Sequence, residues 1–270
     1  MLEIRNITKT FFPGTVNEVR ALRGVTLTIE DGCFAAIIGT NGSGKSTLLN
    51  AVAGTFLPDE GSVFIDGTDI THWPEHKRAR LVGRVFQNPF AGTAAEMTIA
   101  ENIAIAMKRG KSRGVGQALS RSVRDEIADK VRALNMGLEN RLDNPIGTLS
   151  GGQRQALTLL MATWVRPKLL LLDEHTAALD PKSAAQVAAL TSEIIARDKL
   201  TVLMVTHSMQ QAVQMPGRVV MMHAGNVVED YAGERKKGLR IADLMRAFDR
   251  VRRRDLFDAA VANIVVPQYA

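Results

Sequence analysis

Short runs of apolar residues recur along the chain at the length of buried β-strands. Three of these runs, residues 34–38, 169–172 and 201–206, are almost continuously apolar. Runs of this length and type are typical of strands covered on both faces, as in a parallel sheet. Residues 2–8 instead alternate apolar and polar side chains, which predicts a strand with one covered face. The pattern therefore predicts a sheet-based core with an antiparallel edge near the N-terminus.

Between the predicted strands, apolar residues recur at helical spacing. The predicted helices are residues 46–53, 98–107, 117–136 and 153–165, so that 88–165 is mostly helical. Strands interleaved with helices predict a fold of the α/β class. Beyond residue 235, an amphipathic terminal helix offers apolar positions for packing. These positions are Leu239, Ile241, Leu244, Met245 and Phe248.

Composition favours one large domain. The chain has 270 residues, of which 46% are hydrophobic, enough to bury a sizeable core. The single cysteine, Cys33, excludes an internal disulfide and suits a reducing cytoplasm. It opens a predicted buried strand, where packing is its expected role.

The first strand follows Met1 without a signal segment, and no apolar run approaches the roughly 20 residues of a membrane span. Any membrane location is therefore expected to come through a partner.

A glycine-rich segment, GTNGSGKST at residues 39–47, fits a phosphate-binding loop between a strand and a helix. Glycine lets the backbone approach closely, so the amides of the loop can surround the phosphates of ATP. Lys45 would reach the β- and γ-phosphate oxygens, and the Ser46 hydroxyl would ligate Mg²⁺. A glycine-rich turn without a ligand is the alternative, which the strand–loop–helix context disfavours. The predicted nucleotide-binding residues are Gly39, Thr40, Asn41, Gly42, Ser43, Gly44, Lys45, Ser46 and Thr47.

Two carboxylates, Asp173 and Glu174, follow the apolar run 169–172. Open α/β sheets bind their ligands at the carboxyl ends of the strands. Asp173 is predicted to hold Mg²⁺, usually through water, and Glu174 is the candidate general base that orients and polarises the attacking water. A plain acidic cluster at a helix start is the alternative. The phosphate loop elsewhere in the chain favours the catalytic interpretation.

The segment LSGGQRQ at residues 149–155 lies between these two motifs. Together the motifs resemble the ATP-binding subunit of the ABC transporter family, for which LSGGQRQ is nearly diagnostic, and the match covers nearly the whole chain. The resemblance implies that the residues at the start of this segment bind the γ-phosphate held by the opposite subunit of a head-to-tail homodimer. A helix over 153–165 would aim its positive amino end at that phosphate. The residues implied are Ser150, Gly151, Gly152 and Gln153.

The resemblance also gives roles to residues outside these motifs. Gln87 in VFQNP is similar to the glutamine that contacts Mg²⁺ and water, and His207 to the switch histidine that holds the γ-phosphate and the water in register with Glu174. Residues 177–180, ending in Asp180, resemble the dimer-contact loop. Phe11 resembles the aromatic that stacks on adenine, although Phe12 could take that place and either could belong to the core. The predicted catalytic residues are Lys45, Gln87, Glu174 and His207, and the predicted metal ligands are Ser46, Gln87 and Asp173.

The same resemblance implies a P-loop NTPase fold of the ABC type. Its parts are a mixed central sheet, an antiparallel β subdomain and a helical subdomain. We expect a single domain over 1–270. Within it, residues 1–87 and 166–235 form the nucleotide-binding core, 88–165 the helical subdomain with the signature, and 236–270 a C-terminal helical extension.

The formal net charge is +6, and basic residues are concentrated at 108–113 and 235–254. Such surfaces could attract nucleic acid or anionic lipid. We favour a solvated loop and an amphipathic helix, because glycine interrupts the first cluster and apolar residues line the second. No nucleic-acid partner is expected, since no aromatic platform for single strands is evident. Trp73 and Trp164 are assigned to core or interface packing.

Longer segments, such as GRVFQNPFAGTAAEMTIAENIAIA, resemble stand-alone bacterial ATPases whose partners are similar to branched-chain amino-acid-type permeases and periplasmic or extracellular solute-binding proteins. This resemblance implies a homodimer that hydrolyses ATP with Mg²⁺ on the cytoplasmic face of the membrane. It would energise import of a small solute, such as an amino acid, through two separate permease subunits. A cytoplasmic helix of the permease would dock near residues 87–96.

Two alternatives stay open at the level of sequence. A soluble ABC ATPase that drives an assembly process, such as iron–sulphur cluster assembly, would carry almost identical motifs. Stand-alone subunits also serve some exporters, although residues 141–148 lack the glutamate that many exporters carry before the signature. The identity of the partner separates these possibilities.

Overall fold

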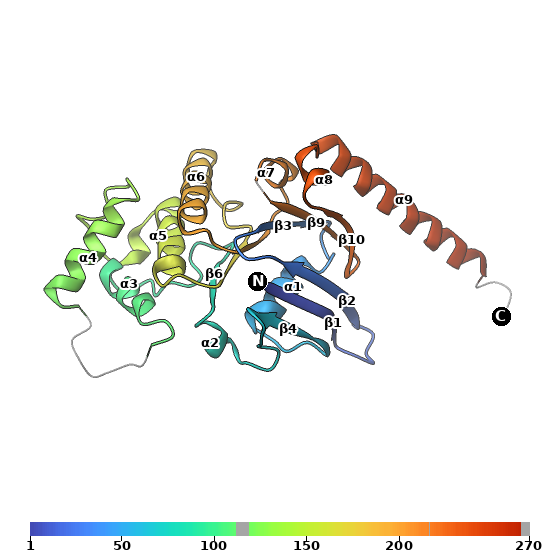
Figure 1. Ribbon diagram of the computed structural model, residues 1–270, viewed down its shortest axis with the longest axis horizontal. Coiled ribbons are helices and arrows are strands. Elements are labelled where there is room, and N and C mark those ends of the chain that lie inside the picture. Colours follow the sequence, from blue (N-terminus) through green and yellow to red (C-terminus); the bar gives the residue numbers. More distant parts are fainter. Residues whose placement is uncertain (112–118, 216, 266–270) are drawn as a thin grey trace.

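The computed structural model describes residues 1–111, 119–215 and 217–265, with side chains through residue 253. Two sheets and the helices that cover them form the fold (Figure 1). The strands are β1 (Leu2–Phe11), β2 (Val19–Ile29), β3 (Phe34–Gly39), β4 (Glu60–Ile65), β5 (Thr68–Asp69), β6 (Val82–Val85), β7 (Leu169–Asp173), β8 (Val202–Val205), β9 (Arg218–His223) and β10 (Asn226–Tyr231). The helices are α1 (Lys45–Ala53), α2 (Glu75–Arg78), α3 (Ile99–Met107), α4 (Arg121–Arg132), the 3₁₀ turn η1 (Ile146–Thr148), α5 (Gly151–Trp164), α6 (Pro181–Asp198), α7 (Met209–Gln214), α8 (Glu234–Lys237) and α9 (Ile241–Val265).

The first sheet is antiparallel, with the strand order β2-β1-β4-β5. The second sheet has the order β10-β9-β3-β8-β7-β6 and is parallel except for the edge strand β10. The predicted α/β fold with a mixed sheet and an antiparallel β subdomain is confirmed. The predicted alternation in the first strand holds for Leu2 and Ile4, and a register shift in the pairing with β2 then makes Ile7 the next buried side chain.

The continuous apolar runs form central strands of the second sheet, whose two faces are both covered. Leu169 and Leu171 of β7 pack in the same cluster as residues of α1. Leu170 and Leu172, which point the other way, pack with Leu159 of α5 and residues of α6. A strand buried on both faces must be apolar at every position, and this requirement explains the runs.

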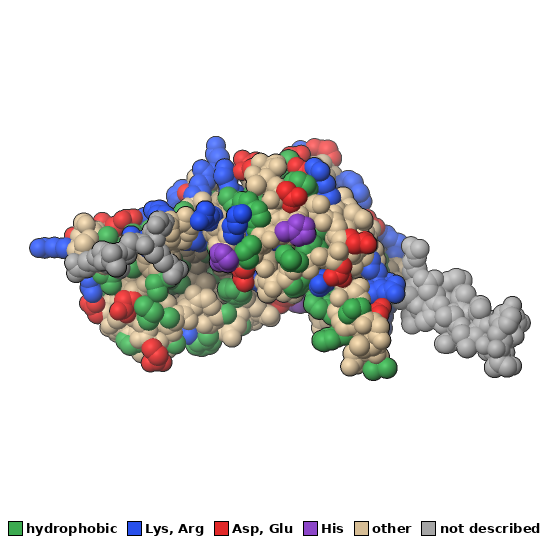
Figure 2. Space-filling model, turned by 90° about the horizontal axis from the view of Figure 1, so that it is seen from below, with side chains coloured by type: hydrophobic (Ala, Val, Ile, Leu, Met, Phe, Trp, Pro, Cys, Tyr) green, Lys and Arg blue, Asp and Glu red, His purple; other side chains and the backbone are tan. Residues whose placement is uncertain are grey.

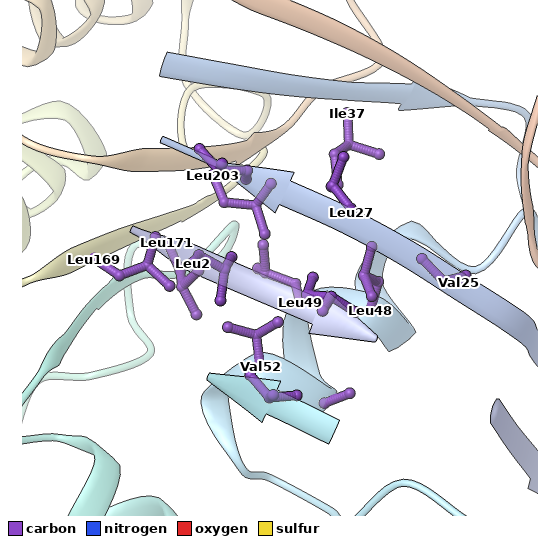
Figure 3. Close-up of a cluster of buried hydrophobic side chains, with 14 of the residues drawn as sticks. Leu2, Val25, Leu27, Ile37, Leu48, Leu49, Val52, Leu169, Leu171 and Leu203 are labelled. Atoms are coloured by element: carbon purple, nitrogen blue, oxygen red, sulfur yellow. The ribbon is translucent and has the colours of Figure 1, made fainter. Parts of the chain in front are cut away.

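Helix α1 lies between the two sheets and joins them into one core. Its side chains Leu48, Leu49 and Val52 are fully buried. Figure 3 shows them in one cluster with side chains of both sheets, among them Leu2 of the antiparallel sheet and Leu171 of the parallel sheet. Because α1 begins directly at the phosphate loop, this packing fixes the position of the loop relative to both sheets.

The helices α3, α4 and α5 lie together at the end of the molecule opposite the antiparallel sheet (Figure 1). They share a separate apolar cluster that includes Ile103, Ile127 and Leu157. The predicted helical subdomain is therefore present. Two predicted bounds differ from the structure: of the helix predicted over 117–136, residues 117 and 118 lie outside the described part of the chain and the helix spans Arg121–Arg132, and the signature helix begins at Gly151 rather than at residue 153. Serine caps explain where the two helices begin, because Ser120 and Ser150 each accept a hydrogen bond from a first-turn amide.

Among the side chains described at the start of α9 and just before it, some pack against the parallel sheet and others do not. Leu239 and Leu244 are buried and Phe248 packs against their cluster, as expected. Ile241 and Met245 remain 41% and 55% exposed, so within one chain they are available for packing but are not buried. The helix contacts the parallel-sheet cluster through one face only, and Ile241 and Met245 lie outside that face.

The other packing assignments agree with the structure. Trp73 packs against the core around α1, and Trp164 packs against the helical cluster. Cys33 is half-buried, and burial raises the pKa of its thiol.

Within the described residues, none of the helices is long and apolar enough to cross a membrane. Both acidic and basic side chains occur on the face that Figure 2 shows, and residues 112 and 113 of the first basic segment and the side chain of residue 254 in the second lie outside the described part of the chain.

Candidate active site

The glycine-rich loop forms a compact turn between β3 and α1. Gly42 and Gly44 have positive φ angles of 75° and 96°, which L-residues with a side chain rarely adopt. A Cβ atom at Gly44 would lie 2.4 Å from the carbonyl oxygen of Ala21, and one at Gly39 would lie 2.3 Å from that of Met222. Gly44 is also the N-cap of α1 and supplies no side-chain cap. The first-turn amides of α1 therefore have no side-chain cap, an arrangement that suits an anion.

Lys45 lies inside this loop and is only 5% exposed. Its ammonium donates hydrogen bonds to the carbonyl oxygens of Gly39 and Thr40, both at 2.9 Å. Burial lowers the pKa of Lys45, and the nearby carboxylates of Glu174 and Asp173 oppose that shift. A lysine has three donors, so one remains for a phosphate oxygen.

A cavity of about 380 Å³ opens above the loop. It brings together an aromatic ring, the uncapped amides and the Lys45 ammonium, which are the groups that a nucleoside triphosphate requires. Phe11 lines this cavity, whereas Phe12 does not and is 66% exposed. The lining residues are Phe11, Val19, Ala21, Asn41, Gly42, Ser43, Gly44, Lys45, Ser46, Thr47, Glu174 and His207.

Glu174 lies at this cavity immediately after β7. Its backbone has a positive φ of 44°, and its side chain is 9% exposed. One carboxylate oxygen is 2.6 Å from Nε2 of His207, and the other accepts a hydrogen bond of 3.0 Å from Nε2 of Gln87. The structure therefore brings together three of the predicted catalytic residues. Strand pairing explains the arrangement, because β6, β7 and β8 are adjacent and parallel and end at the same edge.

Asp173 lies at the same edge but faces a cation that the sequence analysis did not identify. Its Oδ2 is 3.5 Å from Nη2 of Arg84, which also donates a 2.6 Å hydrogen bond to Oδ1 of Asn50. The only signal in the sequence is a charged residue inside the otherwise apolar strand VGRV. Asp173, Ser46 and Gln87 supply oxygen atoms of the kind that Mg²⁺ prefers, a carboxylate, a hydroxyl and an amide.

The signature residues lie outside the cavity of the phosphate loop. Ser150 caps α5, and a reciprocal pair of hydrogen bonds of 3.3 Å joins it to Gln153. A Cβ atom at Gly151 would lie 3.3 Å from Leu179, next to Asp180, so the signature and the predicted dimer-contact loop are neighbours. Asp180 caps α6 by accepting from the amide of Ser183 at 3.0 Å. One chain therefore does not bring its signature to its own phosphate loop.

The assembled groups can support hydrolysis of a bound nucleotide. The loop and Lys45 are suited to holding phosphates. A carboxylate held by an imidazole and an amide is suited to accepting a proton from a water molecule. At the amino end of α5 the Ser150 side chain caps only the Gln153 amide, so this end of the helix is still suited to a phosphate presented by another chain.

Comparisons with known proteins agree with this site. The family model described as ABC transporter matches residues 22–177. The tyrosine transport ATP-binding protein of Clostridioides difficile (strain R20291) is 40% identical over 250 residues, 92% of this chain and 99% of the relative. The methionine import ATP-binding protein MetN 2 of Pseudomonas entomophila (strain L48) is 34% identical over 85% of this chain and 66% of the relative.

Solved structures show the same fold. A dimeric ATP-binding cassette in a post-hydrolysis state, bound to ADP and Pi, superposes with a TM-score of 0.73 at 30% identity. This match covers 86% of the present chain and 98% of the cassette. A nucleotide-free cassette from an ABC transporter superposes with a TM-score of 0.72 at 27% identity and covers 88% and 93% of the two chains.

Proposed function

The chain belongs to the ABC transporter family as an ATP-binding subunit of an import system, and from this premise we propose that it energises uptake of a small solute, with amino acids as the favoured class. It is an ATPase. The amino-acid class is supported by the tyrosine and methionine systems in which its relatives work. The observation that carries the hydrolytic mechanism is Glu174, held by Gln87 and His207 beside the phosphate loop.

In the proposed mechanism, the loop amides and Lys45 bind the phosphates, and Phe11 stacks on the adenine. Ser46, Asp173 and Gln87 would hold Mg²⁺, which supplies charge neutralisation at the β- and γ-phosphates. Glu174 orients the attacking water and accepts its proton, while His207 keeps the carboxylate in place. The chain acts as a homodimer, in which Ser150 and its neighbours would complete the site of the opposite chain.

The variant Glu174→Gln tests the hydrolytic role. The amide keeps the shape of the carboxylate but cannot accept the proton, so we expect ATP hydrolysis to fall by about 100-fold or more. ATP binding, measured by calorimetry, should stay within a factor of about two, because Glu174 is not assigned to phosphate binding. Unchanged steady-state hydrolysis in this variant would remove Glu174 from the base role.

The proposed partners are two permease subunits and, outside the cell, a solute-binding protein, so that the chain associates with the membrane from the cytoplasm. The proposed docking surface is near residues 87–96. Its aromatic residue Phe90 is 57% exposed, and the guanidinium of Arg154 lies 4.4 Å from the ring. Because Arg154 is on the signature helix, this contact connects the docking surface to the signature.

Mass spectrometry of proteins that co-purify with tagged Glu174→Gln tests the partner. The complex would be purified from gently solubilised membranes with ATP, which should hold the dimer closed. A polytopic permease is the expected companion. Soluble scaffold proteins alone, with none from the membrane fraction, would support the assembly ATPase instead, an alternative that the transport relatives do not favour.

A further inference from the structure

Arg84 is a largely buried cation at the site, and the roles proposed above do not use it. It lies on β6, and its side chain is 13% exposed. Nη2 donates to Asn50 Oδ1 at 2.6 Å, and Nη1 donates to Thr55 Oγ1 at 3.2 Å. The guanidinium carbon also lies 4.6 Å from the centre of the Phe86 ring. Two hydrogen bonds and a ring contact therefore hold the guanidinium in one place.

The partners of Arg84 come from the elements that carry the proposed metal ligands. Asn50 is on α1, four residues after Ser46, and Asp173 ends β7. Arg84 pairs with Leu171 in the β6–β7 ladder, two residues before Asp173, so both side chains lie on the face of the sheet that α1 covers. The guanidinium thus bridges α1 and the carboxyl end of β7.

The charges around Asp173 explain why a cation is needed there. Asp173 is 15% exposed and is followed directly by the acidic Glu174. The Lys45 ammonium interacts with both carboxylates and would attract Asp173 towards the phosphate loop. Arg84 offers Asp173 a second cation, 3.5 Å from its Oδ2. A fixed cation on this side favours one orientation of the carboxylate and leaves its other oxygen for a ligand.

We propose that Arg84 is a positioning residue for Asp173. It engages Oδ2 and leaves Oδ1 for the water molecules that would surround Mg²⁺. Through its hydrogen bond to Asn50 on α1, it also fixes the position of the Asp173 carboxylate relative to Ser46 on the same helix. The inference rests on the proposed function, because it takes Asp173 and Ser46 as metal ligands. Groups that orient a metal ligand from behind typically change metal affinity by about 10–100-fold when they are removed. A cation placed only to neutralise charge would have the opposite effect, since its removal would strengthen Mg²⁺ binding.

The test compares Arg84→Met with Arg80→Met, the same substitution at an exposed arginine on the same segment. Mn²⁺ would replace Mg²⁺, and its binding in the presence of ADP would be followed by electron paramagnetic resonance. We expect Arg84→Met to weaken Mn²⁺ binding by about tenfold or more and Arg80→Met to leave it unchanged. ADP binding in EDTA, measured by calorimetry, should stay within about twofold in both variants, because phosphate contacts do not involve Arg84.

Equal or tighter Mn²⁺ binding by folded Arg84→Met would overturn the inference. If that variant fails to fold, Arg84→Lys replaces it. Lysine keeps the charge but loses the planar fork, so its Mn²⁺ binding should also weaken, and unchanged binding by Arg84→Lys would overturn the positioning role. The proposed function has a separate failure: wild-type protein that binds no nucleotide, with or without metal.

Discussion

At the scale of single residues, buried polar side chains fix the backbone next to the site through specific hydrogen bonds. His175 is one of them, and it follows Glu174 directly. Its side chain is 3% exposed, and its Nε2 lies 3.0 Å from Thr191 Oγ1 on α6. The Thr191 hydroxyl donates to the carbonyl oxygen of Val187 at 2.7 Å, so it accepts from the imidazole. His175 therefore fixes the turn after Glu174 to α6 as a neutral hydrogen-bond donor.

The neutrality of His175 predicts sensitivity to acid. Burial lowers its pKa from the ordinary 6.5 to about 4. In this case the unfolded chain takes up a proton at a higher pH than the folded chain does. Stability is therefore lost as the pH falls from about 6.5 towards 4, by about 2 kcal/mol at pH 5. Urea unfolding at pH 7.5 and 5 should show this extra loss in the wild type and not in His175→Gln, which keeps an Nε2 donor.

Thr191→Val provides the control for this prediction. The substitution removes the partner of the imidazole but leaves the imidazole buried. Because burial is the cause of the lowered pKa, the variant should be less stable at both pH values and should keep the additional loss at pH 5. Parallel pH dependences of the wild type and His175→Gln would show that another group titrates.

The sequence predicted the residues that meet at Glu174 because each ends or follows an apolar strand. Gln87, Glu174 and His207 come after β6, β7 and β8, and parallel strands in one sheet end at one edge. Arg84 could not be predicted in this way. Its partner Asn50 is 34 residues distant in sequence and on another element, so only the packing of α1 against the sheet brings the two side chains together.

At the scale of elements, α5 shows how one capping residue can serve both folding and function. Ser150 Oγ accepts a hydrogen bond from the amide of Gln153. The hydroxyl hydrogen is then still available to donate to a phosphate of an opposite chain. The same residue therefore stabilises the helix and completes its proposed anion site.

The variants Ser150→Ala and Ser120→Ala separate these two roles. Both serines are N-caps, of α5 and of α4, and accept from the amide three residues later. Each substitution should lower the free energy of unfolding by about 1 kcal/mol, measured in urea. Only Ser150→Ala should also lower ATP hydrolysis, by about tenfold or more, because it removes a donor to the developing phosphate charge.

Equal hydrolysis by Ser150→Ala and Ser120→Ala would confine Ser150 to a structural role. The sequence predicted the existence of both helices from the spacing of their apolar residues. It misplaced their first residues because the capping serines, rather than the apolar periodicity, decide where a helix begins. The exposed Ile241 and Met245 have a similar explanation, since an apolar pattern does not show how much of a helix the rest of the chain covers.

At the scale of the whole molecule, the phosphate loop and the signature lie apart within one chain. The cavity of the phosphate loop is lined by residues of β1 and β2, the loop itself, Glu174 and His207, and by no residue of the signature. Each motif could be identified in the sequence, but the spatial separation of the phosphate loop and the signature within one chain could not. The dimeric cassette with ADP and Pi, which shares the fold, is consistent with sites formed between two chains.

Mixing two inactive variants tests whether each site contains residues of both chains. Lys45→Ala disables the phosphate loop, and Ser150→Arg blocks the signature. In a mixed head-to-tail dimer, the intact loop of one chain meets the intact signature of the other, which restores one of the two sites. Random pairing at equal concentrations makes half of the dimers mixed, so ATP hydrolysis should recover to about a quarter of the wild-type rate if the two sites act independently.

The control for this experiment is a mixture of Lys45→Ala with the double variant Lys45→Ala, Ser150→Arg. No dimer in that mixture contains an intact phosphate loop, so its hydrolysis should stay at the level of the single variants. Recovery in the first mixture alone would show that Lys45 of one chain acts with Ser150 of the other. Equal rates in both mixtures would contradict independent shared sites, because the pairing that should restore a site would then have no effect.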